Sequence, residues 1–380
     1  MAPFDDVYRE RNVLVTGHTG FKGSWLTSWL QELGANVTGY ALDPNTEPSL
    51  FTLIQGRLAI TDHRGDIRDQ ASVERVIEQT RPHVIFHLAA QPIVRRSYDS
   101  PVETFAINAL GTATLLEAVR RVARPCAVVI VTSDKCYENV DWAWGYRETD
   151  KLGGHDPYSA SKAAAELVVD SWRRSFFPPS RATEHGIRVA SVRSGNVIGG
   201  GDWSPDRLIP DCIRALIAKN VIRVRKPDAR RPWQHVLQPL SGYLWLGALM
   251  LHASRDVLLG AWNFGPAPRD SRSVAEVVDR VIAAWGAGRS ERLEDGGDVH
   301  EAQQLSLTCD KALHELSWWP TWTFETALEQ TTWWYRAWAD GGQDPWSLCQ
   351  RQIRQYTDDA RAQNAPWAAA LERRGSGVAH

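Results

Sequence analysis

Two pairs of side chains suited to proton transfer lie close together in the middle of the sequence. Tyr158 and Lys162 are four residues apart, so on a helix they share one face and the ammonium makes the phenol easier to deprotonate. Asp134 and Lys135, next to Ser133, form a second acid–base pair that hydride transfer to a ketone does not need. The sequence therefore predicts more than one proton transfer per turnover, although a Tyr–Lys pair alone is also common on helix surfaces.

A glycine-rich turn follows the first expected strand, residues 12–16, and precedes a segment with helical apolar spacing, residues 24–33. Glycines in such a turn let the backbone approach a pyrophosphate, while the helix N-terminus offers free N–H donors. The spacing differs from the G-x-G-x-x-G form. The residues predicted to hold a dinucleotide here are Gly17, His18, Gly20, Phe21, Lys22 and Gly23.

Asp43 ends the second expected strand, residues 36–42, twenty residues after Gly23. A carboxylate at this point accepts hydrogen bonds from an adenosine ribose and repels a 2′-phosphate, which favours NAD over NADP. Lys22 is a cation that can interact with the adenosine end of either cofactor. The alternative role of Asp43 is a turn cap before Pro44.

Apolar segments 84–88, 127–131 and 187–193 alternate with helical stretches near 69–80 and 101–122. Continuous apolar strands between helices predict an α/β fold with a Rossmann-type doubly wound parallel sheet, whose ligands gather at the carboxyl ends of the strands. Ala89 and Ser133 fall at such ends. Asp66 and Ile67 follow a shorter strand near 58–65 and suit an adenine pocket, or else cap the next helix.

Several motifs together carry a family resemblance. The glycine turn, Leu88-Ala89-Ala90, Asn108 and the Tyr158–Lys162 pair resemble the extended short-chain dehydrogenase/reductase family, which includes nucleotide-sugar epimerases and 4,6-dehydratases. Segments 16–25, 41–44, 132–139 and 231–236 are most similar to the dehydratases of this family that act on CDP-glucose. The resemblance covers about residues 8–340 and implies NAD as cofactor, with Leu88, Ala89 and Ala90 beside it.

The resemblance implies oxidation of the sugar at C4, loss of water across C5 and C6, and return of the hydride to C6. Tyr158 would take the C4 hydroxyl proton, and Lys162 would assist it and hold the nicotinamide ribose. Ser133 would orient O4, and Asp134, as a neutral acid, would protonate the departing C6 hydroxyl. Lys135 would remove the C5 proton.

Lys135 stands where the related dTDP-glucose dehydratases carry a glutamate. An amine acts as a base only when neutral, so the alternative is that Lys135 stays a cation and stabilises the enolate while another group takes the proton. Glu138 is the nearest other carboxylate. The Asp-Lys pair also resembles dehydratases of UDP-N-acetylglucosamine, whereas segments 136–148 and 231–236 favour CDP-glucose. A dTDP-glucose dehydratase and a 4-epimerase are further alternatives.

Polar residues beyond Lys162 suit substrate capture. A glycine-rich loop at 194–202 follows strand 187–193 and allows close backbone approach to a sugar or diphosphate. Guanidinium groups bind phosphate oxygens in a bidentate way, although clustered arginines, such as Arg230 with Arg231, are often only solvated charge. His235 suits either the site or the core. The expected substrate residues are Gln91, Asn196, Arg207, Arg231 and His235.

Composition limits the remaining classes of function. A net charge of −2 over 380 residues argues against nucleic-acid and anionic-membrane partners. The five scattered cysteines indicate neither a disulfide framework nor a metal site, which favours a cytoplasmic, reducing location. The N-terminus lacks the apolar core of a signal peptide, and no apolar run reaches the roughly 20 residues of a membrane span.

The expected organisation is a dinucleotide-binding domain, mainly residues 1–190, interleaved with a smaller nucleotide-sugar-binding lobe, mainly 191–345. Residues 346–380 form a C-terminal helix and tail. The chain has 18 tryptophans, several of them between 318 and 338, and we expect them to serve packing rather than sugar stacking. The family resemblance implies a homodimer built on helices near 101–122 and 156–176, or a dimer of dimers.

Overall fold

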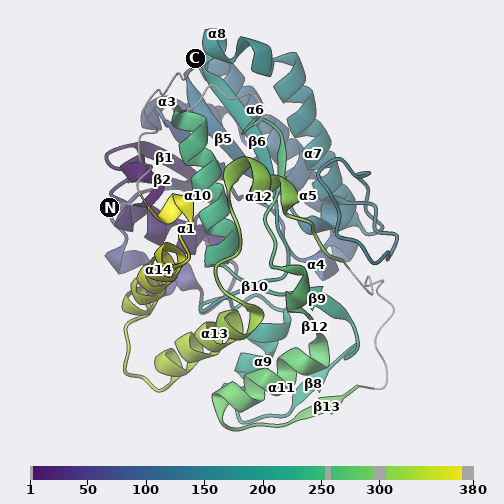
Figure 1. The fold of residues 1–380 in the computed structure, drawn as a ribbon. Helices are drawn as coiled ribbons and strands as arrows, with labels where there is room; N and C mark the ends of the chain where they lie inside the picture. Colours follow the sequence, from purple (N-terminus) through teal and green to yellow (C-terminus); the bar gives the residue numbers. More distant parts are fainter. Residues whose placement is uncertain (1–2, 253–257, 294–304, 370–380) are drawn as a thin grey trace, which may run out of the picture.

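A seven-stranded parallel sheet forms the centre of the molecule (Figure 1). The computed structural model describes residues 3–252, 258–293 and 305–369. The strand order is β11-β6-β5-β4-β1-β2-β3, and every neighbouring pair is parallel. The strands are β1 (Asn12–Thr16), β2 (Asn36–Ala41), β3 (Thr61–Arg64), β4 (Val84–His87), β5 (Cys126–Val131), β6 (Ile187–Arg193) and β11 (Ala261–Asn263). The last of these was not predicted from the sequence.

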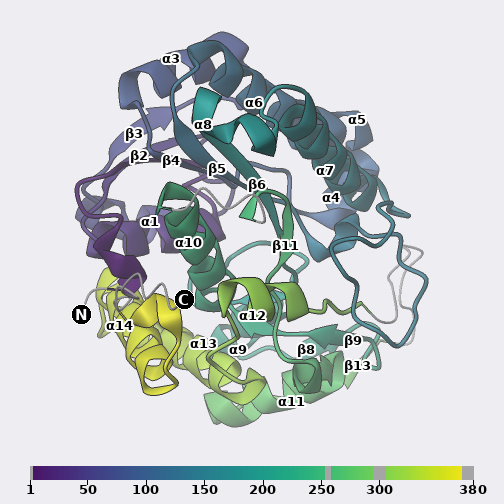
Figure 2. The same ribbon diagram turned by 45° about the horizontal axis from the view of Figure 1, so that its top comes forward.

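Helices cover both faces of the sheet (Figure 2). One face carries α3 (Gln70–Thr80), α6 (Gly111–Val122) and α7 (Pro157–Ser175), and the other carries α1 (Phe21–Glu32), α10 (Leu237–His252) and α14 (Pro345–Ala362). The central strands β4 and β5 are buried along their whole length, which is why their sequences are continuously apolar. The doubly wound α/β fold is confirmed.

Local sequence signals set where two of these helices begin. Asp156 caps α7 by accepting from the Ser159 N–H, and Pro157 occupies the first helical position. Asp69 caps α3 in the same way. Asp66 is therefore not the cap of this helix.

The helix expected over 101–122 is divided into three parts. It consists of α5 (Pro101–Phe105), a π-helical turn (Ala106–Leu110) and α6. Asn108 lies in the π turn, where its amide donates to Gln91 O at 3.2 Å and to Ser161 Oγ at 2.9 Å. The wider turn thus holds the loop after β4 against α7, a use of π turns that is frequent near functional sites.

A smaller lobe packs below the carboxyl ends of the strands (Figures 1 and 2). Its elements are α9 (Leu208–Ile217), β8 (Ile222–Val224), β9 (Arg230–Pro232), β12 (Ser271–Ser273), α11 (Val274–Trp285), β13 (Ser290–Arg292) and α13 (Phe324–Ala339). Helix α12 (Asp310–Leu316) packs against β11 of the sheet. Short elements complete the chain: α2 (Leu50–Ile54), α4 (Val94–Asp99), α8 (Ala182–His185), β7 (Val197–Ile198) and β10 (Gln234–His235).

The lobe and the sheet share one core. Trp318 and Trp334 are fully buried in the same apolar cluster as Trp25 and Trp29 of α1, which supports packing as the role of the C-terminal tryptophans. After the lobe has begun, the chain returns to the sheet at β11, which pairs with β6. The division of the chain into two domains near residue 190 stays a prediction. The expected tail beyond residue 369 lies outside the described residues.

Candidate active site

A cavity of about 570 Å³ runs along the carboxyl ends of the strands and opens between the sheet and the smaller lobe. Its lining includes every residue predicted for cofactor, catalysis and substrate except His18 and His235. Strand-end residues from β1, β2, β4 and β5 therefore meet in one place, as a parallel sheet requires. The cavity also has lining residues that sequence reasoning missed, among them Arg95 and Arg225.

The glycine turn is shaped for close approach by a ligand. Gly17 has a φ of +76°, and a Cβ there would overlap the backbone of Ala89. A Cβ at Gly23 would overlap Gly17 O, so the turn stays tight against β4 and α1. Gly20 begins α1 without a side-chain cap, which leaves N–H donors free for a phosphate. The turn fits the pyrophosphate of a dinucleotide.

The carboxylates of Asp43 and Asp66 follow β2 and β3 and border the cavity. The Asp43 side chain is 87% exposed, and its Oδ1 lies 3.7 Å from Arg64 Nε. The Arg68 guanidinium donates to both carboxylate oxygens of Asp66, and these hydrogen bonds lower the pKa of Asp66. Asp66 and Ile67 line the cavity, as the adenine-pocket hypothesis requires.

His18 lies behind the glycine turn instead of facing the cavity. Its Nε2 is 2.9 Å from Asp62 Oδ1, its ring covers Gly39 of β2, and its side chain is fully buried. Burial lowers the pKa of His18, against the raising effect of Asp62. The structure therefore gives the His18 side chain a supporting position under the turn, outside the lining of the cavity.

Lys22 points toward the catalytic side of the cavity and not toward the adenosine end. Its Nζ donates to Ser194 Oγ at 3.0 Å, and Ser194 Oγ lies 2.5 Å from the Tyr243 hydroxyl. Burial is the main reason that the pKa of Lys22 is lowered to about 7; the charges of Arg207 and Lys162 act in the same direction, and Asp134 acts against them. The Lys22 side chain therefore interacts electrostatically with Asp134, Lys162 and Arg207.

Tyr158 and Lys162 lie one turn apart on α7, as predicted. Burial is the largest influence on the pKa of each side chain. Desolvation raises the pKa of Tyr158 to about 12, partly offset by a hydrogen bond with Ser133. Burial lowers the pKa of Lys162 to about 8, and Glu166 acts in the opposite direction. The Lys162 Nζ donates to Val131 O at 3.4 Å. The expected easing of phenol deprotonation is therefore not visible in the protein alone.

The second acid–base group forms a short 3-10 turn, Asp134–Cys136, after β5. Ser133 Oγ donates to Asp134 Oδ1 at 3.0 Å and accepts the Lys135 N–H at 3.2 Å. Asn196 Nδ2 lies 3.4 Å from Asp134 Oδ2. Asp134 is buried and Lys135 is half-buried in the lining of the cavity. The predicted acid, the Ser133 hydroxyl and Asn196 are thus in contact.

Glu138 does not compete with Lys135 for access to a substrate. Its carboxylate lies 2.8 Å from Lys151 Nζ, is 46% exposed, and is absent from the cavity lining. Glu138 therefore lies outside the cavity that Lys135 borders.

Arginines line the end of the cavity formed by the smaller lobe. Arg207 contacts Asp202 at 3.3 Å, whereas Arg95 and Arg225 both approach Asp206, at 3.6 and 3.5 Å. Arg231 lines the cavity, and its Nη1 donates to the Arg230 carbonyl at 2.8 Å. These guanidinium groups suit a diphosphate. Nothing in the sequence pattern marked Arg95 or Arg225.

Arg230 and Gln91 take structural partners. Arg230 lies 3.6 Å from Glu276 and outside the cavity lining. Gln91 lines the cavity, but its amide donates to Thr104 and its carbonyl accepts from the Ile93 N–H at 2.6 Å. Gln91 therefore shapes the loop after β4 as well as bordering the substrate space.

His235 lies in the core and not in the site. Its side chain is fully buried, in edge contact with Trp25 at 5.9 Å and Trp322 at 4.9 Å between ring centroids. Burial lowers the pKa of His235 to about 3, so the ring stays neutral. The structure therefore does not place His235 with the substrate residues.

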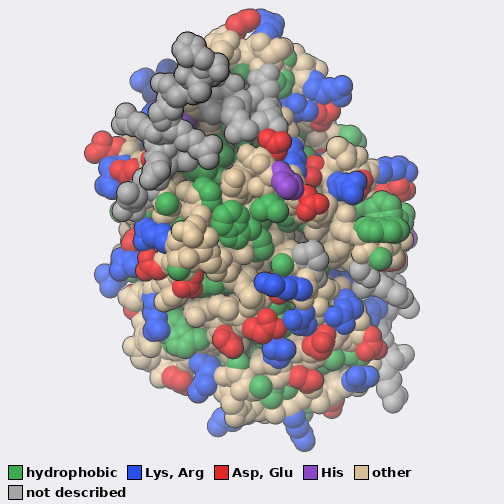
Figure 3. All heavy atoms as spheres, in the orientation of Figure 1, with side chains coloured by type: hydrophobic (Ala, Val, Ile, Leu, Met, Phe, Trp, Pro, Cys, Tyr) green, Lys and Arg blue, Asp and Glu red, His purple; other side chains and the backbone are tan. Residues whose placement is uncertain are grey.

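Metal sites, membrane spans and surface charge were the remaining expectations from the sequence. Among the described residues, no group of three or more His, Cys, Asp or Glu side chains is arranged to hold a metal ion. No helix in the described part of the chain has the length and apolarity needed to span a membrane. On the face shown in Figure 3, acidic and basic side chains are interspersed, in keeping with the net charge of −2.

Comparisons with known proteins identify the family of the chain. The family model for GDP-mannose 4,6 dehydratase matches residues 14–254. CDP-glucose 4,6-dehydratase of Salmonella typhimurium is 47% identical over 349 residues, covering 92% of this chain and 97% of that protein. The dTDP-glucose 4,6-dehydratase of the same organism is 26% identical, covering 86% and 92%.

Solved structures with NAD share the fold. A dTDP-glucose 4,6-dehydratase from Bacillus anthracis in complex with NAD has a TM-score of 0.71 at 24% identity, covering 87% of this chain and 98% of that one. UDP-glucose 4-epimerase of Thermus thermophilus in complex with NAD has a TM-score of 0.71 at 25% identity, covering 85% and 98%. The family predicted from the motifs is confirmed: the chain belongs to the NAD-dependent nucleotide-sugar 4,6-dehydratases.

Proposed function

We propose that this chain catalyses the NAD-dependent dehydration of CDP-D-glucose to CDP-4-dehydro-6-deoxy-D-glucose. The observation that carries the proposal is the junction of two acid–base groups in one cavity: Tyr158 with Lys162, and Asp134 with Ser133. The 47% identity to a CDP-glucose 4,6-dehydratase supports the choice of substrate and reaction.

In the proposed reaction, bound NAD+ supplies the hydride acceptor for C4 and, once reduced, the donor for C6. Tyr158 takes the proton of the C4 hydroxyl, and Lys162 binds the nicotinamide ribose. Ser133, in hydrogen-bond contact with Tyr158, keeps O4 oriented toward the phenol. Burial raises the pKa of Tyr158, while the hydrogen bond with Ser133 and the charge of Arg207 act in the opposite direction and favour the phenolate.

Elimination then uses the neighbouring group. Asp134, protonated, donates to the departing C6 hydroxyl, and Asn196 and Ser133 hold its carboxyl group in place. Lys135 removes the C5 proton after the C4 ketone has acidified it. Arg207 and Arg231 bind the diphosphate at the lobe end of the cavity.

The test is incubation of the purified protein with NAD+ and, separately, CDP-glucose, UDP-N-acetylglucosamine and dTDP-glucose, followed by product analysis. We expect a 4-keto-6-deoxy sugar from CDP-glucose at the highest kcat/KM. Faster turnover of either other substrate would replace the proposed substrate. Conversion of CDP-glucose to CDP-galactose would replace dehydration with 4-epimerisation.

We also propose that the chain forms a homodimer through α5, the π turn and α7, which pack together along one side of the molecule. Val102, Leu110 and Leu167 on these elements are 81%, 62% and 61% exposed, and Phe105 is 38% exposed. Apolar side chains exposed together are typical of an interface. Dimers pairing into tetramers remain an alternative.

We further propose a reducing, cytoplasmic location, which the five free thiols support.

A further inference from the structure

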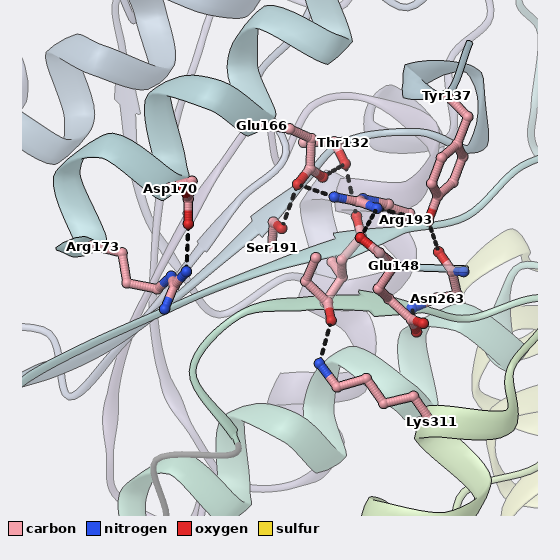
Figure 4. Close-up of polar contacts among 12 residues, drawn as sticks. Thr132, Tyr137, Glu148, Glu166, Asp170, Arg173, Ser191, Arg193, Asn263 and Lys311 are labelled. Atoms are coloured by element: carbon pink, nitrogen blue, oxygen red, sulfur yellow. Dashed lines mark hydrogen bonds and ion pairs between the residues drawn. The ribbon is translucent and has the colours of Figure 1, made fainter. Parts of the chain in front are cut away.

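Glu166 is a fully enclosed carboxylate on α7, one turn after Lys162, and the proposed reaction gives it no part. It accepts hydrogen bonds from Thr132 Oγ1 at 2.5 Å, Ser191 Oγ at 2.7 Å and Arg193 Nη2 at 2.8 Å (Figure 4). The side chains of Glu166 and Arg193 are each only 3% exposed. A buried ion pair of this kind contributes little net stability, because desolvation offsets the attraction, so its presence calls for another reason.

The partners of Glu166 lead directly to the catalytic residues. Thr132 is the residue before Ser133, so its side-chain bond to Glu166 fixes the end of β5 from which Ser133 and Asp134 extend. On the helix, Glu166 lies one turn from Lys162, and its negative charge acts on the Lys162 ammonium. One carboxylate thus holds the strand end that precedes Ser133 and also acts electrostatically on Lys162.

Arg193 extends the same network away from the cavity. Its Nη1 donates to the Tyr137 hydroxyl at 2.7 Å and to Glu148 O at 3.2 Å. The Tyr137 hydroxyl in turn donates to Asn263 Oδ1 at 2.8 Å (Figure 4). These bonds attach both ends of segment 137–148 to β6 and β11. Arg193 therefore holds Glu166 in place by contacts that are themselves fixed by the sheet.

We propose that Glu166 is a positioning residue for the dehydratase site, which holds Ser133 through Thr132 and the Lys162 ammonium through its charge, and that Arg193 anchors Glu166 for this purpose. The inference rests on the proposed function for its kinetic consequences. It also has a consequence for cofactor binding alone, because the Lys162 ammonium is a donor for the nicotinamide ribose in that proposal.

Loss of the Glu166 charge must shift the pH at which Lys162 loses its proton. Glu166 on α7 and Cys136 after β5 raise the pKa of Lys162, whereas burial lowers it to about 8. Lys162 also faces His87 of β4, which is buried and neutral, and Lys22 of α1. Removing Glu166 takes away the negative charge that raises the pKa of Lys162, so the ammonium is lost at lower pH. The alkaline limb of activity and of NAD+ affinity then moves to lower pH.

The experiment compares Glu166→Gln with Asp170→Asn, which removes a partly exposed carboxylate that pairs with Arg173 and Arg174 one turn further along the same helix (Figure 4). We expect Glu166→Gln to lower kcat with CDP-glucose on the order of 10- to 100-fold with little change in KM. Its alkaline limb should move to lower pH, both in kcat and in NAD+ affinity measured by calorimetry. Asp170→Asn should have the same kcat and the same pH dependence as the unsubstituted protein.

Calorimetry separates this inference from the proposed function, since NAD+ affinity is measured whether or not CDP-glucose turns over. A folded Glu166→Gln variant with unshifted NAD+ binding and unshifted kcat would overturn the inference. If that variant does not fold, Thr132→Val decides, because it removes one hydroxyl and leaves both buried charges paired. We expect Thr132→Val to lower kcat without moving the alkaline limb, and an unchanged kcat would overturn the role of Glu166.

Discussion

The Asp134 carboxylate lies directly against the backbone of Gly195, so closely that a methyl group at position 195 would overlap its oxygen atoms. The Asp134 N–H also donates to Ser194 O at 3.3 Å, and Asn196 contacts the carboxylate. The loop after β6 therefore sets the position of the proposed acid from three consecutive residues. Position 195 must be glycine because a larger side chain would overlap the Asp134 carboxylate.

We expect Gly195→Ala to displace the Asp134 carboxyl group and to slow elimination on the order of 100-fold, with C4 oxidation less affected. NADH absorbance should then accumulate with CDP-glucose while the 4-keto-6-deoxy product forms slowly. Gly56→Ala is the matched control, because a Cβ there meets open space. Unchanged product formation by Gly195→Ala would show that Asp134 tolerates displacement.

Lys135→Met tests the proposed base at C5. Lys135 borders the cavity, so its loss should leave C4 oxidation intact, seen as NADH absorbance, while exchange of the C5 hydrogen with solvent falls on the order of 10²- to 10⁴-fold. Lys151→Met is the control, because Lys151 pairs with Glu138 outside the cavity. Undiminished exchange would leave Lys135 the role of a cation beside the enolate.

The positions of most site residues could be predicted because the fold rule is simple: the carboxyl ends of parallel strands meet at one edge. Gly17, Asp43 and Ser133 follow such strands and do line one cavity. The directions of side chains within the glycine turn could not be predicted in this way. His18 turns under β2 and Lys22 turns toward Ser194, and only the packed positions of β2 and the loop after β6 decide this.

A different limit applies to His235. In an unbroken strand, alternate residues share a face, so Arg231, Trp233 and His235 would be expected together. Arg231 and Trp233 do line the cavity, but β9 ends at Pro232 and β10 starts at Gln234 with a different partner strand. The break turns His235 into the core. No local signal in the sequence marks the partner strand.

Asp43→Asn tests the basis of cofactor choice. The carboxylate borders the cavity near Arg64, so removing its charge lowers repulsion toward a 2′-phosphate and leaves a nearby guanidinium to attract it. We expect the ratio of kcat/KM for NADP+ to that for NAD+ to rise on the order of tenfold. Adding Arg64→Met should reverse part of this gain. An unchanged ratio would favour Asp43 as a turn residue only.

His235→Phe tests the reassignment of this histidine to the core. The folded pKa is about 3 against an ordinary value of 6.5, so between these values the unfolded chain binds a proton that the folded chain lacks. Stability therefore falls as pH drops through this window, by at most about 1.4 kcal/mol per pH unit from this residue. Denaturant unfolding at several pH values should show a shallower fall in the variant, with KM for CDP-glucose unchanged. A raised KM with unchanged pH dependence would return His235 to the substrate site.

The exposed apolar side chains of α5, the π turn and α7 predict the oligomeric state. Each buried leucine or valine stabilises an interface by roughly 1.5–3 kcal/mol, and two-fold symmetry counts each contact twice. Leu110→Glu combined with Leu167→Glu should therefore convert a dimer to monomers in sedimentation velocity. Leu313→Glu is the control, because Leu313 is also exposed, at 44%, but lies on α12, outside this set of helices. A dimer that survives the double substitution would place the interface elsewhere on the molecule.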